Sequence, residues 1–313
     1  MKKKNKLFKI LLMTVIIFNL TGCTKYLKNS DKQIVKNELT GQNLASNILC
    51  KPEAEETIKT YEKYDVNIEE LPACSNLSLN NTKYDGIWTT VFVKPLAIII
   101  IKIGELVKNY GLSVIIITLL IRLILYPITK KTAMQSESLK KAKPELDKLE
   151  IKYTNKTTQD DMMKKSQEMM MIYKKYNINP MSGCLFSFIQ IPLFFAFFEA
   201  MNRLPVIFEE NFLGMQLGTS PMIGIKNGHW YYLILIILVV LATYFSFKLN
   251  SSASMTPEAE KQMKMMSNIS IIFIGIASIT MSAGIELYWI TNSTFTIIQN
   301  LIVKRSKNKC AKN

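Results

Sequence analysis

Apolar residues gather in five long runs after residue 110, and these runs predict five membrane-spanning helices. Each run is near the roughly 20 residues that a helix needs to cross a hydrocarbon layer of about 30 Å. The fourth run is short and joins the fifth through Ser282–Gly284, which predicts a tight hairpin at the outer face. The pattern therefore indicates an all-α membrane protein. The predicted spans are residues 111–129, 182–201, 230–248, 268–281 and 284–303.

The stretch before the first span is apolar as well, but it is interrupted by charges. Residues 88–108 contain three lysines and one glutamate, which argue against a clean span. We expect an amphipathic helix along the outer interface, with Trp88 at the level of the lipid headgroups and the lysines reaching toward water. A sixth span is the competing interpretation.

The distribution of charge predicts which loops lie inside. The 313-residue chain is 49% hydrophobic with a net charge of +15, and loops rich in Lys and Arg stay on the cytoplasmic side. Residues 130–180 hold twelve lysines against seven acidic residues, and the tail after Val303 is also basic. Both segments are therefore expected inside, with the N-terminus outside, which requires an odd number of crossings and favours five spans over six. Because the charge is spread over separate segments, it does not indicate a nucleic-acid-binding module.

The N-terminus has the pattern of an export signal. Residues 1–22 begin with a basic stretch, continue with a short apolar run and end at Leu20-Thr21-Gly22-Cys23, which resembles a bacterial lipobox. We expect Cys23 to carry lipid, palmitate included, on the outer face of the cell membrane. A coincidental match in an ordinary signal peptide or first helix is the alternative.

Residues 23–87 are polar and are predicted to be exported. From residue 24 they contain eight lysines against ten acidic residues and no long apolar run, so the segment looks too small for a convincing independent core. We favour a tether between the lipid anchor and the membrane domain, and a weak partner site is the alternative. Cys50 and Cys74 fall in this exported segment, where a disulfide is permitted, although two free thiols fit the sequence equally well.

Two charged helical stretches follow the first span, separated by Thr154–Lys156, and predict a cytoplasmic helical hairpin over residues 133–178. Methionine is flexible and polarizable, which suits a surface that contacts many apolar client sequences. Packing of the methionines within the hairpin or against the membrane is an equal alternative. The candidate client-contact residues are Met162, Met163, Met169, Met170 and Met171.

An arginine interrupts the first predicted span. Arg122 lies seven residues before Thr129, or about 10 Å of helix from the inner end, and Thr118 and Tyr126 share its helical face. A mid-helix Arg costs roughly 2.5 to 3.5 kcal/mol and normally faces a bundle interior or a water-filled space. The sequence offers no deep Asp or Glu as counter-ion, so we expect a cation in a groove that receives a transient anionic partner. The alternative is a structural role, with Arg122 bonded to backbone carbonyls or lipid phosphate.

Two other spans carry polar residues at comparable depth, and these are expected to converge with Arg122 on a wet cavity. They are Ser187 and Gln190 in the second span, and Tyr288, Asn292, Thr296 and Gln299 in the fifth.

Three blocks of the sequence resemble the YidC-type membrane protein insertases. The blocks are "YGLSVIIITLLIRLILYPITKKTAMQS", "NPMSGCLFSFIQIPLFFAFFEAM" and "LYWITNSTFTIIQNLIVKR", and the likeness covers about residues 85–306. Together with the lipobox they are similar to the lipoprotein form of Gram-positive-type bacteria.

The resemblance implies a five-helix insertase core at residues 109–306, with a hydrophilic groove open to the cytoplasm and to lipid. It implies that Arg122 and Gln190 line this groove, with Trp289, Asn292 and Thr296 as candidates from the fifth span. The cytoplasmic hairpin would receive the clients. The implied partners are nascent membrane proteins, the ribosome, membrane lipid and the Sec channel, unless the protein works alone. The basic tail, residues 307–313, either approaches ribosomal RNA or anchors the chain.

Other classes of function fit less well. The sequence has no phosphate loop and no metal-binding cluster, and its single histidine, His229, stands alone, so we expect neither an enzyme nor a cofactor. A solute transporter or channel is the stronger rival, because an intramembrane charge is also typical of a substrate pathway. The sequence shows no internal repeat and no matching pair of broken helices in its favour.

Overall fold

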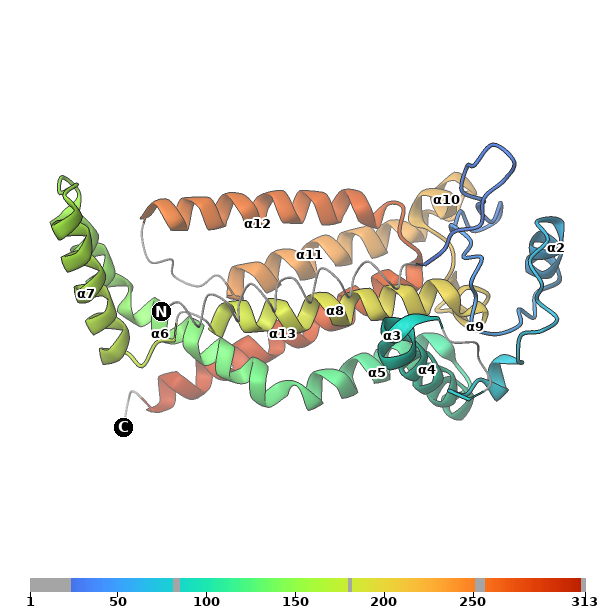
Figure 1. The fold of residues 1–313 in the computed structure, drawn as a ribbon, viewed down its shortest axis with the longest axis horizontal. Coiled ribbons are helices and arrows are strands. Elements are labelled where there is room, and N and C mark those ends of the chain that lie inside the picture. The colour runs from blue at the N-terminus through green and yellow to red at the C-terminus, as the bar shows by residue number, and fades with distance from the viewer. Residues whose placement is uncertain (1–23, 81–84, 180–181, 251–256, 311–313) are drawn as a thin grey trace. The chain divides into compact units, whose positions relative to one another are not determined.

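The fold is seen in a computed structural model that describes residues 24–80, 85–179, 182–250 and 257–310 (Figure 1). The predicted signal peptide, the proposed lipid site Cys23 and the last three residues lie outside the described residues. The chain divides into two compact units, each built from three segments. The first unit is Met1–Thr118, Pro192–Leu235 and Ser278–Tyr288, and the second is Leu119–Ile191, Ile236–Ala277 and Trp289–Asn313.

The described residues are mostly helical. The long helices are α4 (Lys94–Val107), α5 (Tyr110–Ile124), α6 (Tyr126–Tyr153), α7 (Gln159–Lys175), α8 (Ser182–Arg203), α11 (Leu233–Asn250), α12 (Pro257–Ser278) and α13 (Ala283–Cys310). The short helical elements are α2 (Glu55–Lys63), η1 (Cys74–Asn76), α3 (Gly86–Trp88), η2 (Thr89–Val93), α9 (Pro205–Phe208), α10 (Pro221–Lys226) and η3 (Trp230–Tyr232). The strands β1 (Asn211–Phe212) and β2 (Met215–Gln216) form one antiparallel pair.

The first predicted span is not one straight helix. Helix α5 ends at Ile124 and α6 begins at Tyr126, and the two are bent by 67°. Pro127 lies in the first turn of α6, where its missing N–H costs no intrahelical hydrogen bond and its fixed φ suits the start of a helix. The span predicted over residues 111–129 therefore contains a bend near its inner end, and its crossing of the membrane stays a prediction.

Length and composition alone mark few of the described helices as membrane spans. Residues Trp230–Leu249 form a helix that passes such a test by itself, and the bent pair α5 and α6 passes only if it counts as one span. The apolar part of α12, Met263–Ser278, is shorter. Helix α12 begins at Pro257, so the predicted fourth span is the end of a longer helix. The count of five spans stays a prediction.

Residues 24–80 contain a hydrophobic core, contrary to the expectation from their size. The hydroxyl of the buried Tyr61 donates to the carbonyl oxygen of Ala45 at 2.8 Å, and burial raises the pKa of this phenol, with a further contribution from Glu209. Apolar side chains far apart in the sequence thus share one interior. The core residues are Leu27, Val35, Leu44, Ala45, Ile48, Tyr61 and Ile68.

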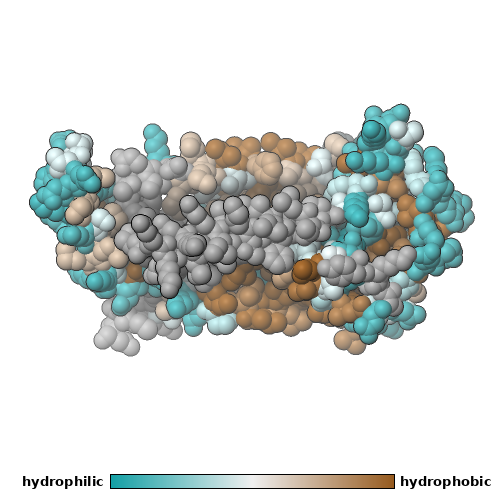
Figure 2. Space-filling view, viewed as in Figure 1, coloured by the Kyte–Doolittle hydropathy of each residue, from teal (hydrophilic) through white to brown (hydrophobic). Residues whose placement is uncertain are grey.

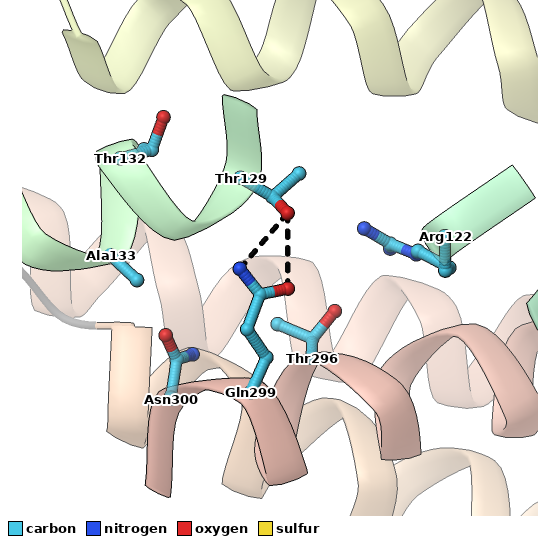
Figure 3. A pocket seen from close by; sticks show the side chains of 7 residues that line it. All are labelled: Arg122, Thr129, Thr132, Ala133, Thr296, Gln299 and Asn300. Atoms are coloured by element: carbon cyan, nitrogen blue, oxygen red, sulfur yellow. Dashed lines mark hydrogen bonds between the residues drawn. The ribbon is translucent and has the colours of Figure 1, made fainter. Parts of the chain in front are cut away.

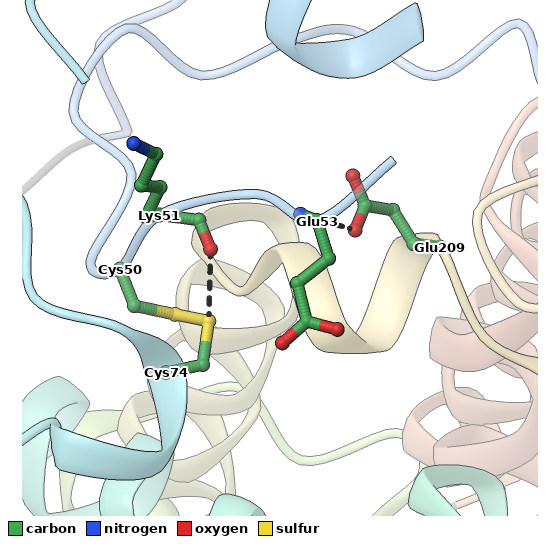
Figure 4. The surroundings of a disulfide bond; sticks show 5 residues. All are labelled: Cys50, Lys51, Glu53, Cys74 and Glu209. Atoms are coloured by element: carbon green, nitrogen blue, oxygen red, sulfur yellow. Dashed lines mark hydrogen bonds between the residues drawn. A yellow bond between two sulfur atoms is a disulfide. The ribbon is translucent and has the colours of Figure 1, made fainter. Parts of the chain in front are cut away.

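A disulfide between Cys50 and Cys74 closes a loop of this segment, which settles the question that the sequence left open (Figure 4). Lys51 and Ala73, beside the two cysteines, form a parallel bridge. The same segment is fixed to the chain around α9, because the backbone N–H of Glu53 donates to the carboxylate of Glu209 at 3.1 Å. The segment is thus a folded part of the first unit, and its exported location and tethering role stay predictions.

The predicted amphipathic helix over residues 88–108 is divided into α3, η2 and α4. Trp88 is buried, and its indole Nε1 donates to the carboxylate of Glu199 at 3.0 Å. Lys94 is buried too, at 3% exposed, and burial lowers its pKa against the opposing effect of Asp85. The expectation that Lys94 reaches water was therefore wrong, and Trp88, expected at the level of the lipid headgroups, is packed inside the protein. Lys102, by contrast, is exposed and donates to the carbonyl of Ser75 at 2.8 Å.

Arg203, at the end of α8, ties several parts of the first unit together. Its guanidinium donates to Glu199 at 2.8 Å and to Asp85 at 2.7 Å, and its Nε donates to the carbonyl of Asn47 at 2.6 Å. A buried guanidinium is stable only when its donors are satisfied. These bonds join residues 24–80, the start of α3 and α8.

Helices α6 and α7 fold back on each other in the second unit. Ala142, Leu146 and Tyr173 form the buried contact between them. Ion pairs connect Glu145 with Lys175 and Glu150 with Lys165, which is an antiparallel order. Figure 2 shows hydrophilic side chains over α7 and hydrophobic ones over α12.

Candidate functional site

Arg122 lies in the second unit with its side chain buried, at 2% exposed. Its Nε donates to Oδ1 of Asn292, on α13, at 2.6 Å. A bond this short from a charged donor is among the strong hydrogen bonds of proteins. Arg122 is thus joined to a neutral amide of α13, and its role as a cation in a groove stays a prediction.

Arg122 also lines a small pocket between the α5–α6 segment and α13 (Figure 3). The pocket has a volume of about 10 Å³, which is near the space that one water needs. No acidic residue lines it, so the guanidinium dominates its potential. Its lining residues are Arg122, Thr129, Thr132, Ala133, Thr296, Gln299 and Asn300.

A second polar contact, between Thr129 and Gln299, lies in the pocket lining with Arg122. The amide Nε2 of Gln299 donates to Oγ1 of Thr129 at 2.9 Å, and the Thr129 hydroxyl lies 3.1 Å from Oε1 of the same amide (Figure 3). Both residues are buried. Beside them, the amide nitrogen of Asn300 is buried without a hydrogen-bond partner among the described residues. The pocket therefore combines a permanent cation with an amide donor that an entering oxygen acceptor would satisfy.

The structure brings together only some of the groove residues expected from the sequence. Arg122, Asn292 and Thr296 meet at the pocket, where the Thr296 hydroxyl donates to the carbonyl of Asn292 at 3.0 Å. The indole of Trp289 instead donates to Oγ1 of Thr243, on α11, at 2.9 Å. Trp289 thus stabilises the contact of α13 with α11.

Three further candidates lie apart from the pocket lining. Thr118 belongs to the first unit, and its hydroxyl donates to the carbonyl of Val114 in its own helix at 2.6 Å. Tyr126 is half-buried, with the ammonium of Lys130 5.8 Å from its ring centroid. Gln190 is half-buried on α8. The pocket lining does not include these three residues, so their place in a groove stays a prediction.

The methionines of α7 divide into two groups. Met169 packs against the core of the α6–α7 hairpin, as the alternative interpretation expected. The others present thioether side chains to the outside, at exposed fractions from 49% to 60%. These exposed residues are Met162, Met163, Met170 and Met171.

Sequence reasoning missed part of the pocket. From the sequence, Thr129 is the last residue of the first span and Thr132, just beyond it, has no role, although both line the pocket with Arg122 after the bend at Leu125. The signal was Pro127, which favours the start of a new helix. Gln299, which the sequence places on the polar face of this span, and Asn300 both lie about two helical turns beyond Asn292, so this face of α13 continues toward its C-terminal end.

Comparison with known proteins finds the same family of membrane proteins in each case. The model of the family described as 60Kd inner membrane protein matches residues 102–310. The membrane protein insertase YidC of Oceanobacillus iheyensis is 34% identical over 226 residues, which are 71% of this chain and 85% of that protein. MisCA of Bacillus subtilis is 34% identical over 69% of this chain and 79% of its own length.

A further relative and one solved structure complete the comparison. YidC 2 of Listeria monocytogenes serotype 4b is 35% identical over 243 residues, covering 75% of this chain and 82% of that protein. A crystal structure of an active YidC insertase with its first transmembrane domain resolved has a TM-score of 0.42 at 26% identity, covering 79% of this chain and 52% of that one. On the family model and the sequence identities, this chain belongs to the YidC family of membrane protein insertases.

Proposed function

We propose that this chain inserts nascent membrane proteins into the bacterial cell membrane, with the pocket at Arg122 as the first binding site for a polar client segment. The observation that carries the proposal is a fully buried guanidinium beside other polar groups, in a chain of the YidC family. Charged side chains within membrane segments are costly and usually serve function. The hydrogen bond from Arg122 to Asn292 has a neutral acceptor and so does not cancel the charge, which in this proposal attracts an anion.

The proposed topology has five spans, a lipid on Cys23 at the outer face and the C-terminus in the cytoplasm. Its support is the excess of lysine in residues 130–180 and in the tail after Val303. The disulfide between Cys50 and Cys74 fits an exported segment, because disulfides persist in oxidising compartments. In this arrangement the α6–α7 hairpin faces the cytoplasm and the folded segment 24–80 faces outward.

In the proposed mechanism, an acidic client segment exchanges places with an internal partner of Arg122. A client carboxylate accepts a hydrogen bond from the guanidinium in place of the Asn292 amide, and the new bond is charge-assisted on both sides. Entry of the segment requires the pocket to widen, since its resting volume of about 10 Å³ holds only about one water. A polar, hydrated site within the membrane lowers the desolvation cost of the crossing.

The exposed methionines of α7 are the proposed contact for the client's apolar helix before it enters lipid. Flexible thioether side chains adapt to different sequences. Burial of the client helix in the hydrocarbon layer then drives insertion, without a nucleotide or cofactor. The ribosome and the Sec channel are the proposed partners of this step, and work by the protein alone is the alternative.

Reconstitution in liposomes tests the function. A one-span client with an acidic N-terminal segment is synthesised in the presence of vesicles with the protein, empty vesicles, or vesicles with heat-denatured protein. Protease-protected client should accumulate only with the native protein. Equal protection in empty vesicles would contradict the proposal. Uptake of small solutes without client insertion would instead favour a transporter.

A further inference from the structure

The pair β1 and β2 has an apolar and conformationally unusual tip. Asn211 pairs with Gln216 and Phe212 with Met215, which leaves Leu213 and Gly214 as the two turn residues. Both have positive φ, +51° at Leu213 and +79° at Gly214. Such turns favour Asn or Asp at the first position, and a bulky residue there is strained. Leu213 nevertheless occupies it, with 80% of its surface exposed.

Three contacts fix this hairpin to the starts of apolar helices in the first unit. Phe212 packs on Gly111, at the start of α5, where its ring fills the space that a Cβ would need. On the other side, the hydroxyl of Tyr231 donates to the carbonyl of Gly214 at 3.1 Å. The backbone N–H of Gln216 donates to the hydroxyl of Tyr232 at 2.8 Å. The tip is therefore held at the level where α5 and α11 begin.

The surroundings of the tip have the character of a membrane interface. The apolar run Trp230–Leu249 starts with Trp230, which is 66% exposed, and Tyr231, which is 47% exposed. Tryptophan and tyrosine at the end of a membrane helix prefer the headgroup region. Residues 211–216 contain no charged side chain, so the tip can enter lipid without desolvating a charge. The exposed apolar tip is thus bonded, through Tyr231, to the start of an apolar helix.

We propose that the tip of the β1–β2 hairpin is a lipid-inserted wedge, in which Leu213 enters the outer leaflet beside Trp230 and Tyr231. Its partner is the boundary between headgroups and acyl chains. The contacts of Phe212 and Tyr231 set the depth of insertion, and the wedge fixes the vertical position of the adjoining helices in the bilayer. This role is separate from the binding of clients at Arg122.

Fluorescence quenching in liposomes measures the depth of the tip. An environment-sensitive dye is attached to Leu213→Cys in the full chain with Cys184 and Cys310 replaced by Ser. Matched labels at Glu62→Cys, exposed on α2, and Leu241→Cys, exposed on α11, serve as water-facing and membrane references. The Glu62 label also reports the dye's own affinity for lipid. Quenchers are lipids with a nitroxide near the headgroup or deep in the acyl chain, and aqueous iodide.

If the tip is inserted in lipid, the shallow nitroxide should quench the Leu213 label at least roughly twice as strongly as it quenches the Glu62 label. Iodide should quench the Leu213 label less than the Glu62 label. If iodide quenches the two labels equally and the shallow nitroxide does not distinguish them, the tip is in water and the proposal fails. It also fails if neither quencher reaches the Leu213 label, since a second copy or another protein then covers the tip. Protease resistance equal to that of the unlabelled chain establishes that each labelled variant is folded.

Discussion

Arg122 on α5 and Asn292 on α13 are joined by a hydrogen bond of 2.6 Å between Nε and Oδ1, within one compact unit. The bond connects two helices that are 170 residues apart in sequence, and it satisfies part of a guanidinium that has almost no access to solvent. The amide of Asn292 is neutral, so this bond satisfies a donor without cancelling the charge, as a carboxylate would. In the proposed mechanism, that charge attracts an anionic client.

Replacing Asn292 with Ala should destabilise the contact of α5 with α13. Loss of the amide removes one acceptor from a buried cation, for which we expect a cost of about 1 to 3 kcal/mol. The midpoint of unfolding in a graded series of denaturing detergent measures this cost. Thr294→Ala is the matched control, because Thr294 is exposed on the same helix. Equal midpoints for both variants would show that the Asn292 bond contributes no stability.

Thr129 and Gln299 should be coupled in their contributions to the free energy of unfolding. Thr129→Val and Gln299→Leu each remove one side of the contact, and the double variant removes both. Because each single variant leaves a buried polar group without its partner, the effects should not add, and we expect a coupling energy of about 1 kcal/mol. The same unfolding assay measures all four proteins. Additive effects would mean that the 2.9 Å bond is not a determinant of the pocket.

The α6–α7 hairpin should loosen in acid. Lys175 and Tyr176 donate to Glu145 at 2.6 and 2.7 Å, and these hydrogen bonds hold the pKa of that carboxyl below its ordinary value of 4.5. Hydrogen bonds from Lys152 and Tyr153 lower the pKa of Glu168 in the same way. A lowered pKa in the folded state contributes stability above the unfolded value, and this contribution is lost as the pH falls from about 5 through the folded value.

Hydrogen exchange can follow this loosening. Protection factors of amides in α6 and α7, corrected for intrinsic rates, should fall between pH 7 and pH 3, while those in α11 fall less. A double variant with Gln at positions 145 and 168 should have lower protection at pH 7 and little further dependence on pH. Unchanged protection of the original hairpin in acid would show that the two carboxylates do not stabilise it.

Reduction of the disulfide should open the segment 24–80 without unfolding the helices of the second unit. The bridge closes a loop of 24 residues in sequence, and a crosslink over such a loop contributes about 3 kcal/mol in the chain-entropy account. Limited proteolysis should therefore cleave this segment faster in reductant. The variant with Ser at both positions should be cleaved fast with or without reductant. If reductant speeds cleavage of this variant as well, its effect does not come from the bridge.

The sequence predicts the helical class and the burial of Arg122 in a helical bundle well, because apolar runs and an isolated charge within them are local signals. It predicts the inner end of the first span poorly. There, the preference of Pro127 for the first turn of a helix competes with an apolar run that continues through it. The proline's preference prevails, and the chain bends by 67° just before it.

Two other differences have non-local causes. Trp88 and Lys94 look like interfacial residues, yet Trp88 is bonded to Glu199, which is 111 residues away, and Lys94 is buried. The core of residues 24–80 joins apolar residues that show no helical or strand period, so no window of sequence reveals it. Pairings over such distances depend on tertiary packing, which a single sequence does not display.

Insertion measured with Arg122 variants tests the central claim most directly. Wild type, Arg122→Lys and Arg122→Ala are reconstituted at equal density, with Lys226→Ala as a control for the loss of a positive charge elsewhere. Clients are an acidic one-span protein and the same protein with Gln and Asn in its outer segment. Protease-protected client is the measured quantity.

We predict that Arg122→Ala reduces insertion of the acidic client roughly tenfold or more, since a charge-assisted hydrogen bond contributes about 1.5 to 3 kcal/mol. Arg122→Lys and Lys226→Ala should largely retain insertion, and the neutral client should depend less on Arg122. Equal insertion of the acidic client by wild type and Arg122→Ala would contradict the role of the buried charge.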